Sequence, residues 1–145
     1  MITLALDAAD ARFLAADGHA LSAVLPLGAT PLVQHWLRHE PPTAQELEAA
    51  IEAVEDLVMP LHGRWPADAE LQVRLQDPAA ATVAALLGTR FDRDQLESLF
   101  DRAAAIAMGR PVTSDPALAD RRVIAIVLVL REAMHHLGFT QGRIA

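Results

Sequence analysis

The chain has 145 residues and a mass of 15.6 kDa, and 52% of its residues are hydrophobic, which fits one domain, residues 1–145, with a well-formed core. Its net charge of −7 and the absence of any basic cluster beyond Arg121-Arg122 argue against a nucleic-acid partner. The absence of cysteine excludes disulfides, thiolate metal sites and thiol nucleophiles. All twelve basic residues are arginine, so Schiff bases and a P-loop lysine are excluded too.

We expect neither a targeting segment nor a membrane span. Asp7 and Asp10 interrupt the apolar N-terminus, so a signal peptide is not expected. The apolar run from Val123 to Leu130 is much shorter than the roughly 20 residues that cross a bilayer. Arginine without lysine, together with abundant alanine, is typical of a GC-rich bacterial coding sequence. We therefore expect a soluble protein of the bacterial cytoplasm.

The first third of the chain has the pattern of β-strands. Apolar residues alternate along residues 2–7, and two further apolar segments, 12–15 and 20–25, flank the turn signal Asp17-Gly18. This pattern predicts an N-terminal antiparallel meander of three strands. Residues 70–76 alternate strictly between polar and apolar side chains, which predicts a fourth strand added to the same sheet.

Helical signals begin at Thr30-Pro31, because threonine is a good N-cap and proline suits the first helical position. Residues 43–46, Thr-Ala-Gln-Glu, form a capping-box sequence, and apolar residues follow it at helical spacing. Glycine and proline punctuate the rest of the chain. We expect helices over residues 30–39, 43–61, 78–87, 94–108 and 115–138, the last of them in one or two pieces.

The last helix is expected to be central and buried, because residues 123–130 leave no polar face for more than two turns. Residues 140–145 are expected to form a frayed tail. The fold class that follows is α+β: a small antiparallel sheet, made of the N-terminal meander and the strand near 70–76, packed with a bundle of about five helices.

The strongest candidate site lies at the end of the last helix. Glu132 and His135 are one helical turn apart, a spacing at which two side chains can bind one metal ion, and His136 lies beside them. One such pair is too few for a two-metal site in a monomer, although a two-fold dimer doubles it and Glu52 and Glu55 offer further carboxylates. Iron, manganese or zinc would suit these ligands. The alternative is that the histidines only stabilise the negative end of the helix.

A second metal candidate is the pair His35 and His39, which are four residues apart on the predicted 30–39 helix. Trp36 occupies the place of the catalytic glutamate of zinc peptidases, so peptidase chemistry is not expected. The alternative is a half-buried helix face whose histidines cover apolar surface.

A third candidate is an anion site at the start of the same helix. Gly28 precedes Thr30-Pro31, and free N–H groups at a helix N-terminus attract phosphate. Most capped helices begin in this way and bind only water.

The shortage of common catalytic motifs favours a non-enzymatic, helix-rich domain that acts through protein–protein contacts or self-association. A homodimer is expected, and the Ala-rich helices at 78–87 and 94–108 are the predicted interface because their small side chains allow close approach. The two alternatives are a metal-binding or metal-dependent protein that uses Glu132, His135 and His136, and a small-anion binder at Thr30.

Overall fold

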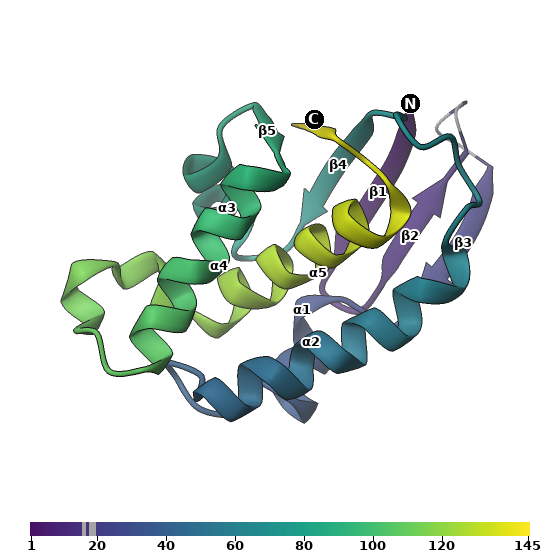
Figure 1. Ribbon diagram of the computed structural model, residues 1–145. Helices are drawn as coiled ribbons and strands as arrows, with labels where there is room; N and C mark the ends of the chain where they lie inside the picture. The colour runs from purple at the N-terminus through teal and green to yellow at the C-terminus, as the bar shows by residue number, and fades with distance from the viewer. Residues whose placement is uncertain (16, 18–19) are drawn as a thin grey trace.

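The structure, a computed structural model, describes residues 1–15, 17 and 20–145. Over these residues a six-stranded sheet forms one layer and five α-helices pack against it (Figure 1), which confirms the α+β class. The strands are β1 Ile2–Asp7, β2 Ala11–Leu14, β3 Leu21–Leu25, β4 Leu71–Gln76, β5 Arg90–Asp92 and β6 Gln141–Ile144. The helices are α1 Ala29–His35, α2 Ala44–Val58, α3 Ala80–Leu87, α4 Arg93–Ala107 and α5 Arg121–Leu137.

The sheet has the strand order β3-β2-β1-β4-β6-β5 and is mixed rather than purely antiparallel. The predicted meander is present as β1, β2 and β3, although Gly18 of its predicted turn lies outside the described residues. The strand predicted near 70–76 joins this meander: β4 pairs with β1 in parallel, from Ile2 opposite Leu71 to Asp7 opposite Gln76. Such a parallel pair needs a crossover connection, and α1 and α2 provide it.

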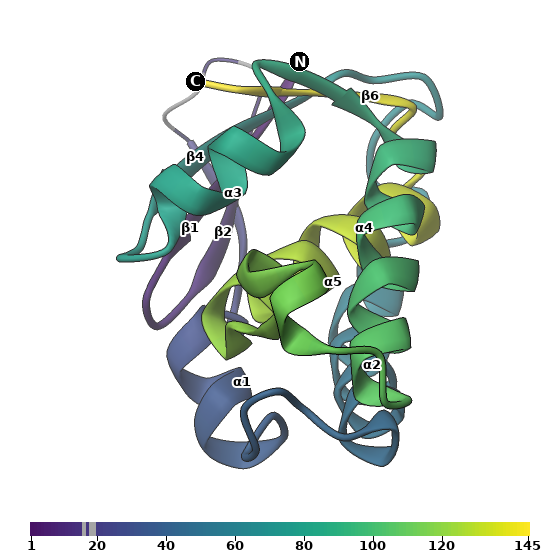
Figure 2. The same cartoon turned by 90° about the vertical axis from the view of Figure 1, so that its left-hand side faces the viewer.

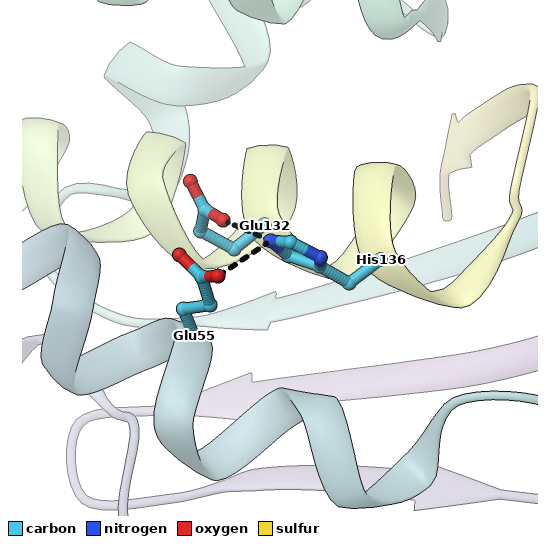
Figure 3. A group of neighbouring side chains, drawn as sticks. All are labelled: Glu55, Glu132 and His136. Atoms are coloured by element: carbon cyan, nitrogen blue, oxygen red, sulfur yellow. Dashed lines mark ion pairs between the residues drawn. The ribbon is translucent and has the colours of Figure 1, made fainter.

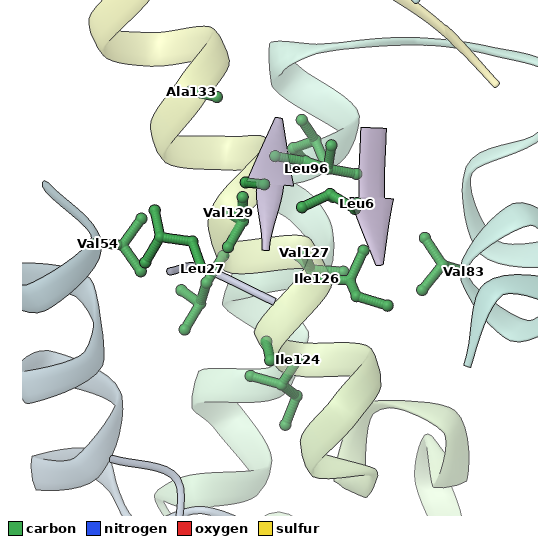
Figure 4. Close-up of a cluster of buried hydrophobic side chains, with 14 of the residues drawn as sticks. Leu6, Leu27, Val54, Val83, Leu96, Ile124, Ile126, Val127, Val129 and Ala133 are labelled. Atoms are coloured by element: carbon green, nitrogen blue, oxygen red, sulfur yellow. The ribbon is translucent and has the colours of Figure 1, made fainter. Parts of the chain in front are cut away.

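Helix α5 is central, as its apolar run predicts. It lies against the sheet and is surrounded by the other helices (Figure 2), and every residue from Val123 to Leu130 is buried. Asp120 caps its start by accepting the N–H groups of Arg122 and Val123, and Gly138 ends it with a positive φ of 82°. Figure 4 shows the core that results, with side chains from α2, α3, α4 and the sheet around α5. No helix within the described residues has the length and apolar content of a membrane span.

Helix α1 is shorter than predicted, because it ends at His35 and not at His39. The N–H of Leu37 turns back to the carbonyl of Leu32, at 2.9 Å. The carboxylate of Glu46 then accepts the N–H groups of Arg38 and His39, at 3.0 and 3.3 Å. Glu46, which belongs to the capping box of α2, therefore binds the backbone that follows α1, and α1 ends at His35.

The last residues do not fray, which corrects the prediction for 140–145. Residues 141–144 form β6, which pairs in parallel with β4 and antiparallel with β5. This strand could not be recognised from the sequence, because the strand is short and Gly142 is its only buried residue. A glycine is required there: a Cβ atom at Gly142 would lie 2.3 Å from the ring of Phe91. The strand is defined by its pairing with β4 and β5 and carries no apolar alternation.

Candidate functional site

The carboxyl ends of β1 and β4 lie side by side at one edge of the sheet, because Asp7 is opposite Gln76 in a parallel pair. In open sheets with parallel strands, ligands bind in the crevice outside the carboxyl ends of those strands. Here β1 runs into the turn 7–10, and β4 runs into Asp77-Pro78. We call these segments, with the starts of α1 and α5, the carboxyl edge.

The turn at the carboxyl edge is organised by Asp7. Its carboxylate accepts the N–H groups of Asp10, at 2.7 Å, and Ala9, at 2.8 Å. These two hydrogen bonds hold the pKa of Asp7 below its usual value, and Arg12, whose guanidinium lies 3.3 Å away, lowers it further. Arg12 also approaches Asp10, at 3.4 Å. The turn therefore presents two partly exposed carboxylates next to one exposed guanidinium.

The start of α1 is fastened to this turn. Gly28 packs so closely that a Cβ atom would lie 2.3 Å from the carbonyl oxygen of Ala8. Its N–H donates to the carbonyl of Ala9, at 3.1 Å, and the N–H of Thr30 donates to that of Ala8, at 2.9 Å. The amide donors that an anion at Gly28 and Thr30 requires thus have partners within the chain, and Pro31 has no N–H to offer.

Arg122 joins α5 to the same edge. Its Nε and Nη2 atoms donate to the carboxylate of Asp77 at 3.2 and 2.5 Å, and its Nη1 donates to the hydroxyl of Thr30 at 3.1 Å. The Asp77 side chain is only 1% exposed and also accepts the N–H of Ala79, at 2.9 Å. A buried bidentate pair of this kind is strong and directional. Sequence reasoning missed it because residues 77 and 122 meet only once the sheet and α5 are in place.

A second polar group lies between α2 and α5, at the other end of the central helix (Figure 3). Among the described residues, one group of three metal-ligating side chains has all its ligand atoms within 4.8 Å of one another: Glu55, Glu132 and His136. The Nε2 atom of His136 is 2.9 Å from Glu132 and 3.9 Å from Glu55. Two of the predicted metal ligands do not join it. Glu52 is exposed on α2, and His135 lines a separate hollow with Arg93, Glu97 and Arg131.

The pair His35 and His39 does not have the helical spacing that a shared metal ion requires, because α1 ends at His35. His39 instead contacts Glu46, with its Nδ1 atom 3.0 Å from the carboxylate. Although burial raises the pKa of Glu46, hydrogen bonds from the Thr43 N–H, the His39 ring and the N–H groups of Arg38 and His39 lower it to about 2. His39 therefore belongs to the cap of α2.

No protein-family model matches the chain, and no curated protein matches it in sequence. Its fold is nevertheless similar to that of solved phosphatases. The Aquifex aeolicus Ppx/GppA phosphatase in its type II variant superposes with a TM-score of 0.74 at 16% identity, over 99% of this chain and 52% of that protein. Another structure of the Aquifex aeolicus family member gives 0.74 at 13% identity, over 99% and 51%. An exopolyphosphatase-like protein gives 0.67 at 10% identity, over 99% and 53%.

These similarities contradict the expectation of a non-enzymatic domain that acts through protein–protein contacts, because the fold is one that phosphatases use. The shortage of catalytic motifs was misleading, because a fold that enzymes use can be recognised without any contiguous catalytic motif. The chain spans about half the length of the phosphatases that it resembles. It therefore has the fold of one half of the Ppx/GppA phosphatases.

Proposed function

We propose that this chain is a phosphohydrolase-type domain that binds a phosphate chain, such as polyphosphate, or another phosphoester at the carboxyl edge. The observation that carries the proposal is the likeness to Ppx/GppA phosphatases over 99% of the chain. Its fold places the carboxyl ends of parallel strands where ligands bind in sheets of this kind. The substrate class is taken from those phosphatases, because one of them is described as exopolyphosphatase-like.

The residue types at the carboxyl edge support this chemistry. Phosphoryl transfer depends mainly on positioning and on neutralising the oxygens of the phosphate. The exposed guanidinium of Arg12 can donate to such oxygens, and the partly exposed carboxylate of Asp10 suits the hydrated Mg²⁺ that accompanies phosphate chains. Arg122, Asp77 and Thr30 act as positioning residues, because their mutual hydrogen bonds hold together three of the four segments that form the edge.

We further propose that the facing wall of the binding cleft lies outside these 145 residues. The phosphatases of the same fold are about twice as long, so this domain corresponds to one side of their structure. The chain on its own should then bind a phosphate chain weakly and hydrolyse it slowly or not at all. Binding is therefore the property to measure first.

The test is titration of a fluorescently labelled linear polyphosphate with the purified chain in the presence of Mg²⁺. We expect saturable binding that Arg12→Gln weakens about tenfold, because one charge-assisted contact to phosphate is lost. Arg90→Gln is the matched control, since Arg90 is also an exposed strand arginine but lies on β5, at the far edge of the sheet. Equal loss in the two variants, or no binding at all, would contradict a site at the carboxyl edge.

The homodimer remains a prediction, with α4 rather than α3 as its proposed interface. The apolar residues of α3, such as Val83 and Leu87, face the core. Helices α2 and α4 instead enclose an apolar hollow lined by Leu47, Ile51, Phe100, Ala104 and Met108, and Met108 is 79% exposed. Light scattering should give twice the mass of the chain, and Met108→Glu should reduce the measured mass to that of a single chain.

A cytoplasmic location also remains a prediction, and it rests on the lack of cysteine.

A further inference from the structure

The residues Glu55, Glu132 and His136 converge on one point between α2 and α5, which we call the α2–α5 cluster. Glu132 and His136 are four residues apart on α5, so they share a face, and Glu55 reaches them from α2 (Figure 3). Both carboxylates are directed at the same atom, Nε2 of His136. Burial falls from Glu132, with its side chain 4% exposed, through His136 at 17% to Glu55 at 44%. The cluster is therefore closed on the core side and open toward solvent at Glu55.

Glu132 is prepared to act as a ligand through only one of its oxygens. The Nη1 atom of Arg131 donates to Oε1 of Glu132 at 2.7 Å, which leaves Oε2 facing His136. Arg131 is itself held by Glu97, at 3.0 Å, and lies over the ring of Phe100, 4.3 Å from its centroid. Outer contacts of this kind fix the orientation of metal ligands and are a regular part of metal sites.

The separations suit a small ion. Two ligand atoms bound to one zinc ion at about 2.0–2.1 Å in tetrahedral geometry lie roughly 3.3 Å apart. The pair His136 and Glu132, at 2.9 Å, is slightly closer than this, and the pair His136 and Glu55, at 3.9 Å, is slightly wider. Glu55 is the most exposed of the three, so a change of its side-chain rotamer can close the gap without moving either helix.

The charged side chains around the cluster also suit a divalent ion. The guanidinium of Arg131 pairs with both Glu132 and Glu97. Three acidic side chains, Glu55, Glu97 and Glu132, therefore lie around a single arginine, which is an excess of two. A divalent ion bound between Glu55 and Glu132 would offset this excess.

We infer that the α2–α5 cluster binds one divalent transition-metal ion, with Glu55, Glu132 and His136 as protein ligands and solvent in the remaining position. Imidazole suits zinc and iron, and carboxylates suit manganese, so Zn²⁺ and Mn²⁺ are the ions to test. The site is separate from the proposed phosphate site. Residues 122 and 136 are fourteen positions apart on α5, about 21 Å along the helix at 1.5 Å per residue.

The test uses the whole chain, purified without a histidine tag and treated with a chelator. Isothermal titration with Zn²⁺ and then with Mn²⁺ should show one site per chain, and the bound ion should raise the melting temperature. Glu55→Gln and His136→Gln should each weaken binding at least about tenfold. Glu55 is partly exposed, so its variant keeps the fold even if changes at the buried Glu132 do not.

Two matched controls separate a shared site from binding by any surface group. His135→Gln changes the neighbouring, exposed histidine, and Glu52→Gln changes an exposed carboxylate one turn before Glu55 on α2. Both variants should bind the ion as the unaltered chain does. If His135→Gln weakens binding as much as His136→Gln, or if the untreated and chelator-treated proteins both take up no ion, the α2–α5 cluster is an ion pair and the inference is wrong.

Discussion

The two ends of helix α5 use charged residues in opposite ways. At its start, Arg122 makes three hydrogen bonds: two with the buried carboxylate of Asp77 and one with the hydroxyl of Thr30. At its other end, Glu132 and His136 face a second carboxylate, Glu55, and acidic side chains outnumber the arginine beside them. The balanced ion pair at the first end indicates a structural contact, and the excess of carboxylates at the second indicates a place for a cation.

The comparison shows what separates a polar group that holds a fold from one that is ready to bind. Both ends contain buried carboxylates, so burial alone does not distinguish them. The difference lies in whether internal donors already satisfy the acceptors. Three substitutions test this distinction. The expected effect on stability falls from the first to the second, and the third is measured by its dependence on pH.

The largest effect is expected for Asp77→Ala. This change leaves the guanidinium of Arg122 without its carboxylate in a mostly buried position, and breaking such a pair typically costs about 3–5 kcal/mol. Urea denaturation should show the loss as a lower midpoint. The control is Asp10→Asn, whose carboxylate is partly exposed and should change the free energy of unfolding by less than about 0.5 kcal/mol. Similar midpoints for the two variants would mean that this contact does not hold α5.

A smaller effect is expected for Glu132→Gln in metal-free protein. The amide keeps the size of the side chain and can still accept from Arg131, which retains Glu97 as a partner. The loss should be about 1.5–3 kcal/mol, the range for one hydrogen bond to a charged group. The midpoint in urea should therefore fall less than for Asp77→Ala. A loss as large as that of Asp77→Ala would show that the α2–α5 cluster is also a structural contact, and the contrast between the two ends would fail.

The third test concerns the pH dependence of stability and uses Glu46, another carboxylate that accepts hydrogen bonds within the chain, at the start of α2. Its pKa is about 2 in the folded chain against an ordinary 4.5, so its charge stabilises the fold above pH 4.5, and this contribution is lost as the pH falls toward 2. The difference in unfolding free energy between the unaltered chain and Glu46→Gln should be constant near neutral pH and shrink below pH 4.5. Glu48→Gln, on the exposed side of α2, should show no such trend. A difference that stays constant down to pH 2.5 would contradict the role of the charge.

The sequence predicted helices and strands well where the residues of the element itself show alternation, a capping sequence or a long apolar run. The meander, the strand near 70–76, the helix that begins at the capping box of Thr43 and the buried α5 all follow from alternation, capping or apolar content. Residues 141–144 were missed because this short strand, with one buried residue, carries no apolar pattern and is defined by its pairing with β4 and β5. Helix α1 was predicted too long because a side chain from the next helix, Glu46, ends it.

The candidate site was predictable only in part. The sequence predicted Glu132 and the neighbouring histidines as metal ligands, because their i, i+3 and i, i+4 spacings lie within one segment. It could not decide between His135 and His136, since that depends on which face of α5 meets α2. Of the carboxyl edge, the sequence indicated only the start of α1, through the predicted anion site at Gly28 and Thr30. Its residues come from four segments, and only the parallel pairing of β1 and β4 brings them together.

The place of β6 in the sheet has a consequence for how the chain folds. Strand β6 lies between β4 and β5, so β5 has no ladder to the rest of the described sheet until residues 141–144 are inserted. The pairing of β6 with β4 joins residues about seventy positions apart, and contacts of such long sequence separation form slowly. During synthesis, the meander and α2 can assemble early, whereas this half of the sheet must wait until residues 141–144 have left the ribosome.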